Sequence, residues 1–225
     1  SIGVMAVDAD GAVSHTYTNA DGLNLVSKYD TFKITVEPVS DTDTGPSTHT
    51  VYSDTIPAAG MMYIRHLLHG CECFGLADDA GITVKLWQQA DIAHQQAALG
   101  VAAATLSDIQ TYAHTVINVI EGSDGTNYDA SAGDPGDGHG VLSHAADTKD
   151  HVGKASAAVP TDSTIVKYSS NASDSSDNVV TWSGEARNHA LDAISATSIT
   201  VAKAYMTNAT TLMARSRDGY DADRD

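Results

Sequence analysis

The stretch LSDIQTYAHTVINVIEG, from Leu106 to Gly122, decides the fold class of the C-terminal half of the chain. Its apolar residues recur every three or four positions, as they do along one face of an α-helix. Ser107 and Asp108 suit the first turn of a helix, and Gly122 suits the position just past its end. The predicted apolar stripe consists of Ile109, Ala113, Val116 and Ile120, flanked by Leu106, Tyr112 and Ile117.

The same helical period predicts further helices on both sides of this stretch. A helix that begins near Val84 has a predicted stripe of Trp87, His94, Ala98 and Val101. Residues 139–158 have a weaker helical pattern, and the Ser/Asn/Asp-rich segment 161–177 is expected to be a loop. A last helix is predicted from about Val179 to Arg215. Four helical segments with short or polar connections predict an antiparallel bundle. The apolar face of the last helix is expected to contain Leu191, Ile194, Ser198, Val201, Tyr205 and Leu212.

The N-terminal quarter has a period of two instead. Between residues 31 and 37, polar and apolar side chains alternate, which predicts a strand with one solvated face. Short strands separated by turn residues predict a small antiparallel β-sandwich. The expected fold class is therefore α+β, with a β-sandwich-like module at 1–58, a linker or short helix at 59–83 and a helical bundle at 84–225 that contains an acidic loop at 122–139. The expected strands are Ile2–Val7, Ala12–Tyr17, Asp30–Val39 and Thr48–Ser53.

One segment of this module resembles a known family. The run DTFKITVEPVSDTDTGPSTHTVYSDTIP, from Asp30 to Pro57, is similar to the extracytoplasmic β-module of anti-sigma-K-type regulators, in which a VTxEP strand precedes a Gly/Pro/Ser loop and a second strand. The resemblance covers these residues only. It implies a small β-sandwich outside the cytoplasm, and it does not imply regulation of a sigma factor.

Composition narrows the class of partner. The net charge is −17, and the acidic residues number 29, of which we count 25 aspartates. Such a chain repels nucleic acid and anionic lipid, and it attracts cations. Abundant Ser, Thr, Ala, Gly and Asp with few lysines are typical of secreted or cell-surface proteins. We therefore expect an extracellular or cell-surface location, self-association, no nucleic-acid partner and no membrane span. Adaptation to high salt explains the charge equally well.

A cluster of nitrogen and sulfur ligands lies in MMYIRHLLHGCECF, residues Met61 to Phe74. His66 and His69 are three positions apart, so they share a face of a helical turn. Cys71 and Cys73 follow after a glycine that lets the chain fold back. Imidazole and thiolate are ligands that zinc and copper prefer, so these four residues are a candidate metal site. Alternatively, the histidines are solvated or hydrogen-bonded, or the cysteines form a disulfide.

The acidic loop is a candidate calcium site. Its sequence from residue 124 to 139, DGTNYDASAGDPGDGH, places oxygen ligands every few positions, and its glycines allow the sharp turns needed to wrap a cation. It does not match an EF-hand. A solvated acidic turn is the alternative. The candidate ligands are Asp124, Asn127, Asp129, Asp134 and Asp137.

Histidines in the bundle raise the alternative of haem binding. Haem held by two histidines requires inward imidazoles that face each other. On a helical wheel only His94 lies on an apolar face, whereas His114 and His189 lie away from it. We expect His94 to be a hydrogen-bonded core histidine.

No motif for a catalytic nucleophile, a metalloprotease or nucleotide binding is present. The sequence therefore favours an extracytoplasmic, cation-stabilised structural or binding protein that assembles with its own copies. The alternatives are a metal or haem redox carrier, and a hydrolase whose site has no sequence signature. Whether the protein is an enzyme is left open by the sequence.

Overall fold

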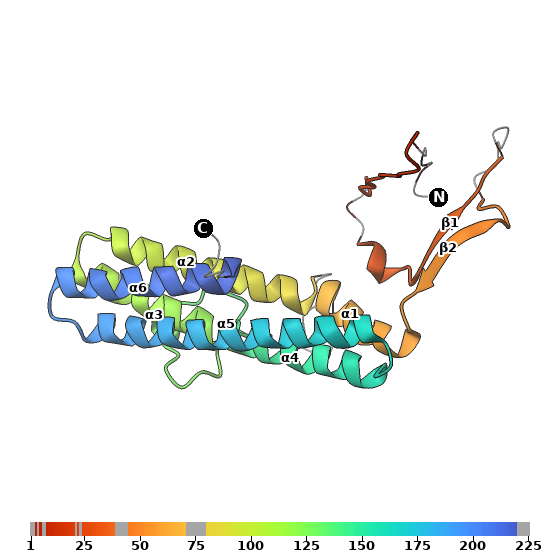
Figure 1. Ribbon diagram of the computed structural model, residues 1–225. Coiled ribbons are helices and arrows are strands. Elements are labelled where there is room, and N and C mark those ends of the chain that lie inside the picture. Colours follow the sequence, from red (N-terminus) through yellow and green to blue (C-terminus); the bar gives the residue numbers. More distant parts are fainter. Residues whose placement is uncertain are drawn as a thin grey trace.

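The computed structural model describes residues 3, 5, 8–20, 22, 24–38, 45–70 and 80–219. Within them, a helical bundle follows a two-stranded hairpin (Figure 1). The elements in chain order are η1 (Leu25–Ser27), β1 (Thr31–Thr35), β2 (Thr50–Thr55), α1 (Ala58–Leu68), α2 (Ile82–Ala102), α3 (Leu106–Glu121), η3 (Ala130–Ala132), α4 (Val141–Ala158), α5 (Ser163–Ser195) and α6 (Ile199–Asp218).

The bundle is organised around its longest helix. α5 has 33 residues and is therefore about 50 Å long at 1.5 Å per residue. It contacts α4, α3 and α6, and α2 contacts α3, α6 and α4. In Figure 1, α3 and α4 follow one another along α5, and α1 packs on α4 near the hairpin end. The junction between α3 and α4 is therefore the place where the acidic loop leaves the bundle.

Small residues line the interior of the bundle. Alanines at positions 90, 93, 97, 113, 186, 190, 193 and 202 are all fully buried. Because interaxial distance depends on the side chains at the contact, these alanines let the helices approach closely. Larger residues of α3, among them Ile109, Val116 and Ile120, fill the centre. The predicted stripe of α3 is confirmed, and so are its first turn, capped by Thr105, and its end at Gly122.

The predicted β-sandwich is wrong. The described residues contain one sheet, the antiparallel pair β1–β2, in which Thr31 pairs with Thr55 and the register shifts between Ile34 and Thr35. Residues 12–17 form no strand, and most of 2–7 lies outside the described residues. Every residue of β2 is exposed, and neither strand contacts a helix. The alternation correctly predicted a strand, but within the described part of the chain there is no second sheet against which the hairpin could pack.

Three helix predictions also need correction. Residues 163–177 are helical, because Asp162 caps α5 through the N–H groups of Thr164 and Ile165, and Ser176 of this segment is buried in the bundle. The expected last helix is two helices, broken between Ser195 and Ile199. Trp87 is 51% exposed, because the buried stripe of α2 consists of its alanines.

No described helix has both the length and the apolar character that crossing a membrane requires.

Candidate metal centre

The acidic loop between α3 and α4 starts and ends at the same point in space. Gly122 ends α3 with a φ of 73°, and Gly140 precedes α4 with a φ of 86°. A Cβ on Gly140 would lie 2.5 Å from the Gly122 nitrogen, so the two backbones touch. The Ser123 N–H donates to the Gly138 carbonyl at 2.8 Å across this neck. Only glycine combines this positive φ with so close an approach.

Buried polar side chains of α2 and α3 hold the loop against the bundle. Asn118 is fully buried, accepts from the Asp129 N–H at 2.8 Å and donates to the carbonyls of Asp129 and Gly133 at 2.7 and 2.8 Å. Glu121 accepts from the backbone and side chain of Asn127, and Arg187 of α5 donates to it at 3.3 Å. Gln89 of α2 accepts from the Asp137 N–H at 3.2 Å. The loop is therefore an ordered part of the fold.

This anchoring brings two histidines and two aspartates together at the start of α4. The His139 Nε2 lies 2.7 Å from the Asp147 Oδ2, and the His144 Nε2 lies 2.8 Å from the Asp137 Oδ2. The two imidazole rings have centroids 4.6 Å apart at an interplanar angle of 68°. His144 is fully buried, whereas His139 and Asp147 are partly exposed. One edge of the cluster is therefore open to solvent.

The ionised state of Asp137 fixes the tautomer of His144. Burial acts to raise the pKa of Asp137, but hydrogen bonds from the His144 ring and from the N–H groups of His139 and Gly140 outweigh burial and lower this pKa. An ionised carboxylate only accepts, so Nε2 of His144 must donate. A neutral His144 then has its lone pair on Nδ1, which is buried and has no hydrogen-bond partner among the described residues.

This arrangement can hold a metal ion. His139, His144 and Asp147 each offer one ligand atom, and these atoms lie within 4.8 Å of one another. Among the described residues, no other group of three or more His, Cys, Asp or Glu side chains meets this condition. Metal-binding histidines typically donate their second ring N–H to a carboxylate, as His144 does to Asp137. The group therefore has both the ligands and the supporting hydrogen bond of a metal centre.

The residues predicted for calcium are not gathered at one point by the described contacts. Asp129 accepts from Ser131 and caps η3, and Asp134 accepts from the Gly136 N–H. Asn127 bonds to Glu121, and Asp137 bonds to His144. Their oxygens thus stabilise turns of the loop, as short polar side chains commonly do. Asp124 lies on the exposed turn after α3. Calcium binding by this set stays a prediction.

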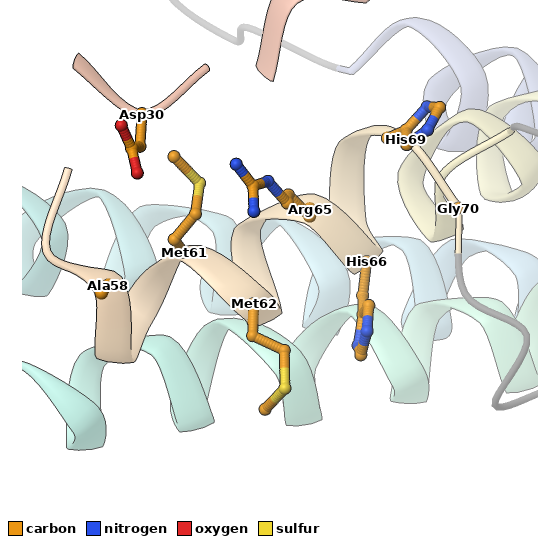
Figure 2. A pocket seen from close by; sticks show the side chains of 8 residues that line it. All are labelled: Asp30, Ala58, Met61, Met62, Arg65, His66, His69 and Gly70. Atoms are coloured by element: carbon orange, nitrogen blue, oxygen red, sulfur yellow. The ribbon is translucent and has the colours of Figure 1, made fainter. Parts of the chain in front are cut away.

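The predicted cluster at residues 66–73 lies only partly within the described residues. His66 is on α1 and His69 is its C-cap, and Figure 2 shows their side chains on different sides of the helix. Both line a hollow of about 370 Å³. Cys71 and Cys73 lie outside the described residues. The four-ligand site therefore stays a prediction.

The three histidines considered for haem have separate partners on separate helices. His94 of α2 lies 3.2 Å from an Arg217 nitrogen, and burial, followed by this charge, lowers its pKa. His114 of α3 lies 3.5 Å from an Asp129 oxygen. His189 of α5 packs beside the Tyr205 ring at 6.0 Å. Among the described contacts none joins two of these imidazoles, and haem binding by them stays a prediction.

Reasoning from sequence missed His139, His144 and Asp147. Asp137 was identified, but as a calcium ligand rather than as the partner of a histidine. A signal was present, because His144, Asp147 and His151 recur at helical spacing on a segment with a weak apolar stripe. His139 precedes that helix, so its proximity depends on how the loop folds back.

Comparison with protein-family models, with curated proteins and with solved structures finds no match to this chain. Function must therefore be inferred from the chemistry of the site.

Proposed function

We propose that this protein is an extracytoplasmic helical-bundle protein that binds a divalent metal ion through His139, His144 and Asp147. The observation that supports this proposal most directly is the convergence of their three ligand atoms within 4.8 Å, around a buried His144 that is oriented by Asp137. The ion would join the end of the acidic loop to the first turns of α4, because His139 lies before α4 and the other two ligands lie on it.

The donor set favours a transition metal over calcium. Two imidazole nitrogens and one carboxylate oxygen suit Zn²⁺, Cu²⁺ or Ni²⁺, whereas Ca²⁺ takes six to eight oxygen ligands. Three protein ligands leave room for water or for a group from a binding partner. Calcium bound by the loop oxygens, from Asp124 to Asp137, is a separate prediction, and the titration below tests it.

The role that we propose for the protein is structural or binding. The net charge of −17 raises the local concentration of cations and disfavours polyanionic partners. The hairpin β1–β2 leaves two strand edges unpaired within the described residues. Open strand edges are common sites of association, which supports the expectation of self-assembly at a cell surface.

Isothermal titration of the full chain with Zn²⁺ and with Ca²⁺ at equal ionic strength tests the proposal. His139→Gln and Asp147→Asn should each weaken Zn²⁺ binding about tenfold or more, without loss of helix content by circular dichroism. His49→Gln is the matched control, because His49 is exposed beside the hairpin and away from the bundle. Unchanged Zn²⁺ affinity in both site variants would refute the metal centre. Calcium binding that survives in both would support the separate loop site.

A further inference from the structure

A second pair of imidazoles lies at the contact between α1 and α4. The ring centroids of His66 and His151 are 5.3 Å apart, with an interplanar angle of 60°, and the Tyr63 ring lies 6.2 Å from that of His151. Figure 2 shows His66 on the opposite side of α1 from Arg65 and His69. His151 is 4% exposed. The two histidines are 85 positions apart in sequence (151 − 66).

A hydrogen bond to a backbone carbonyl fixes the tautomer of His151. The His151 Nδ1 lies 2.9 Å from the Asp147 carbonyl oxygen, and a carbonyl can only accept. Nδ1 of His151 therefore has the proton, and a neutral ring has its lone pair on Nε2. A backbone carbonyl in this position is a common support for a metal-binding histidine. On the other helix, the His66 Nδ1 is buried without a hydrogen-bond partner among the described residues.

The separation of the rings suits tetrahedral coordination. A Zn–N bond of 2.0–2.1 Å places the centroid of each imidazole about 3.2 Å from the metal. Two such rings at the tetrahedral angle would have centroids about 5.2 Å apart, close to the observed 5.3 Å. The same reasoning gives about 4.5 Å for ligands at a right angle, close to the 4.6 Å between His139 and His144.

The environment of His66 disfavours its protonated form. Burial lowers the pKa of His66, and His151 and Lys154 on α4 lower it further. Lys154 is itself paired with Asp150, whose carboxylate lies 3.7 Å from the His151 ring. A neutral imidazole is the form that binds metal.

We propose that His66 and His151 form a second metal site, which joins α1 to α4 and takes a borderline ion such as Zn²⁺ in tetrahedral coordination completed by water. His66 also lines a hollow of about 370 Å³ beside α1. This site is independent of the one at His139, His144 and Asp147, and it fixes α1, together with the hairpin that precedes it, to the bundle.

Cobalt is a suitable probe, because tetrahedral Co²⁺ absorbs visible light much more strongly than six-coordinate Co²⁺. Titration of the full chain should give two equivalents of bound Co²⁺, one of them with intense visible bands. His66→Gln and His151→Gln should each remove these bands and one equivalent, with helix content unchanged by circular dichroism. His139→Gln should remove the other equivalent and leave the bands in place, so failure of either site is distinguished from failure of the other.

His69→Gln separates this site from the histidine–cysteine cluster, because His69 lies on the other side of α1 from His66. The proposal requires that the bands persist in this variant and after alkylation of the cysteines. Bands that survive in both His66→Gln and His151→Gln would overturn it, as would a wild-type chain without tetrahedral bands. Bands lost in His69→Gln or on alkylation would assign the ion to the histidine–cysteine cluster and would also overturn it.

Discussion

Replacement of Asn118 by alanine should detach the acidic loop from α3. The side chain is fully buried and makes three hydrogen bonds to loop backbone groups, at 2.7, 2.8 and 2.8 Å. A hydrogen bond contributes about 1 kcal/mol net, and a buried group left unpaired costs about 1–3 kcal/mol. Because part of the loop can regain water, we expect a total loss of about 3–4 kcal/mol in the free energy of unfolding.

Urea denaturation followed by circular dichroism measures this loss. With an m-value of about 3 kcal/mol per molar urea, the midpoint should fall by about 1 M. Hydrogen exchange should show the Asp129 amide losing protection, because its acceptor is the Asn118 side chain. Asn118→Asp keeps the shape of the side chain but directs a carboxylate at two carbonyls, so it should destabilise without leaving a cavity.

Asn171→Ala is the control for this substitution. Asn171 is exposed on α5, where alanine has the higher helix propensity, so the midpoint should stay constant or rise slightly. The reasoning would be refuted if Asn118→Ala cost less than about 1 kcal/mol, or if the Asp129 amide kept its protection.

Three further substitutions test other parts of the fold. Gly140→Ala should lower the free energy of unfolding by about 2 kcal/mol or more, because φ is 86° and the added Cβ meets the Gly122 backbone. Gly153→Ala, on the exposed face of α4, should instead raise it by about 0.5–1 kcal/mol. Urea denaturation should therefore give a lower midpoint for the first variant and a higher one for the second. Ala190→Leu should cost about 1–3 kcal/mol by overpacking the fully buried contact face of α5, and a thermal midpoint equal to that of the wild type would contradict the close packing. His94 has a pKa lowered by burial and then by Arg217, so the unfolded chain binds its proton more readily, and stability from this site is lost as pH falls below about 6.5. His94→Gln should therefore flatten the pH dependence of stability between pH 7 and 5, and an unaltered slope would show that another group titrates.

The helical half was predictable where local pattern and packing agree. In α3, the apolar stripe, the polar first turn and the terminal glycine all indicate the same helix, and the structure places the stripe in the core. In α2 they disagree, because large residues such as Trp87 and Leu99 face solvent while small alanines face the other helices. A prediction that assigns the largest apolar side chains to the core therefore selects the wrong face of a helix whose buried contacts are made by alanines.

The hairpin and the first half of α5 show how tertiary context decides an element. Alternation over residues 31–37 indicated a strand, but a β-sandwich requires a second apolar face, and the residues of β2 are all exposed. Residues 163–177 are polar and rich in serine, which indicated a loop. They are helical because Asp162 caps the helix and its buried face, including Ser176, packs in the bundle.

The sequence by itself determined the helical period of the C-terminal half, the acidity of the surface and the glycines at which the acidic loop turns. These features depend on residues close together in the chain. Only the tertiary structure decided which histidines meet. His139 reaches His144 because the loop neck closes at Gly122 and Gly140, and His66 reaches His151 because α1 packs on α4. Contacts between distant residues depend on the path of the backbone, and local pattern does not specify that path.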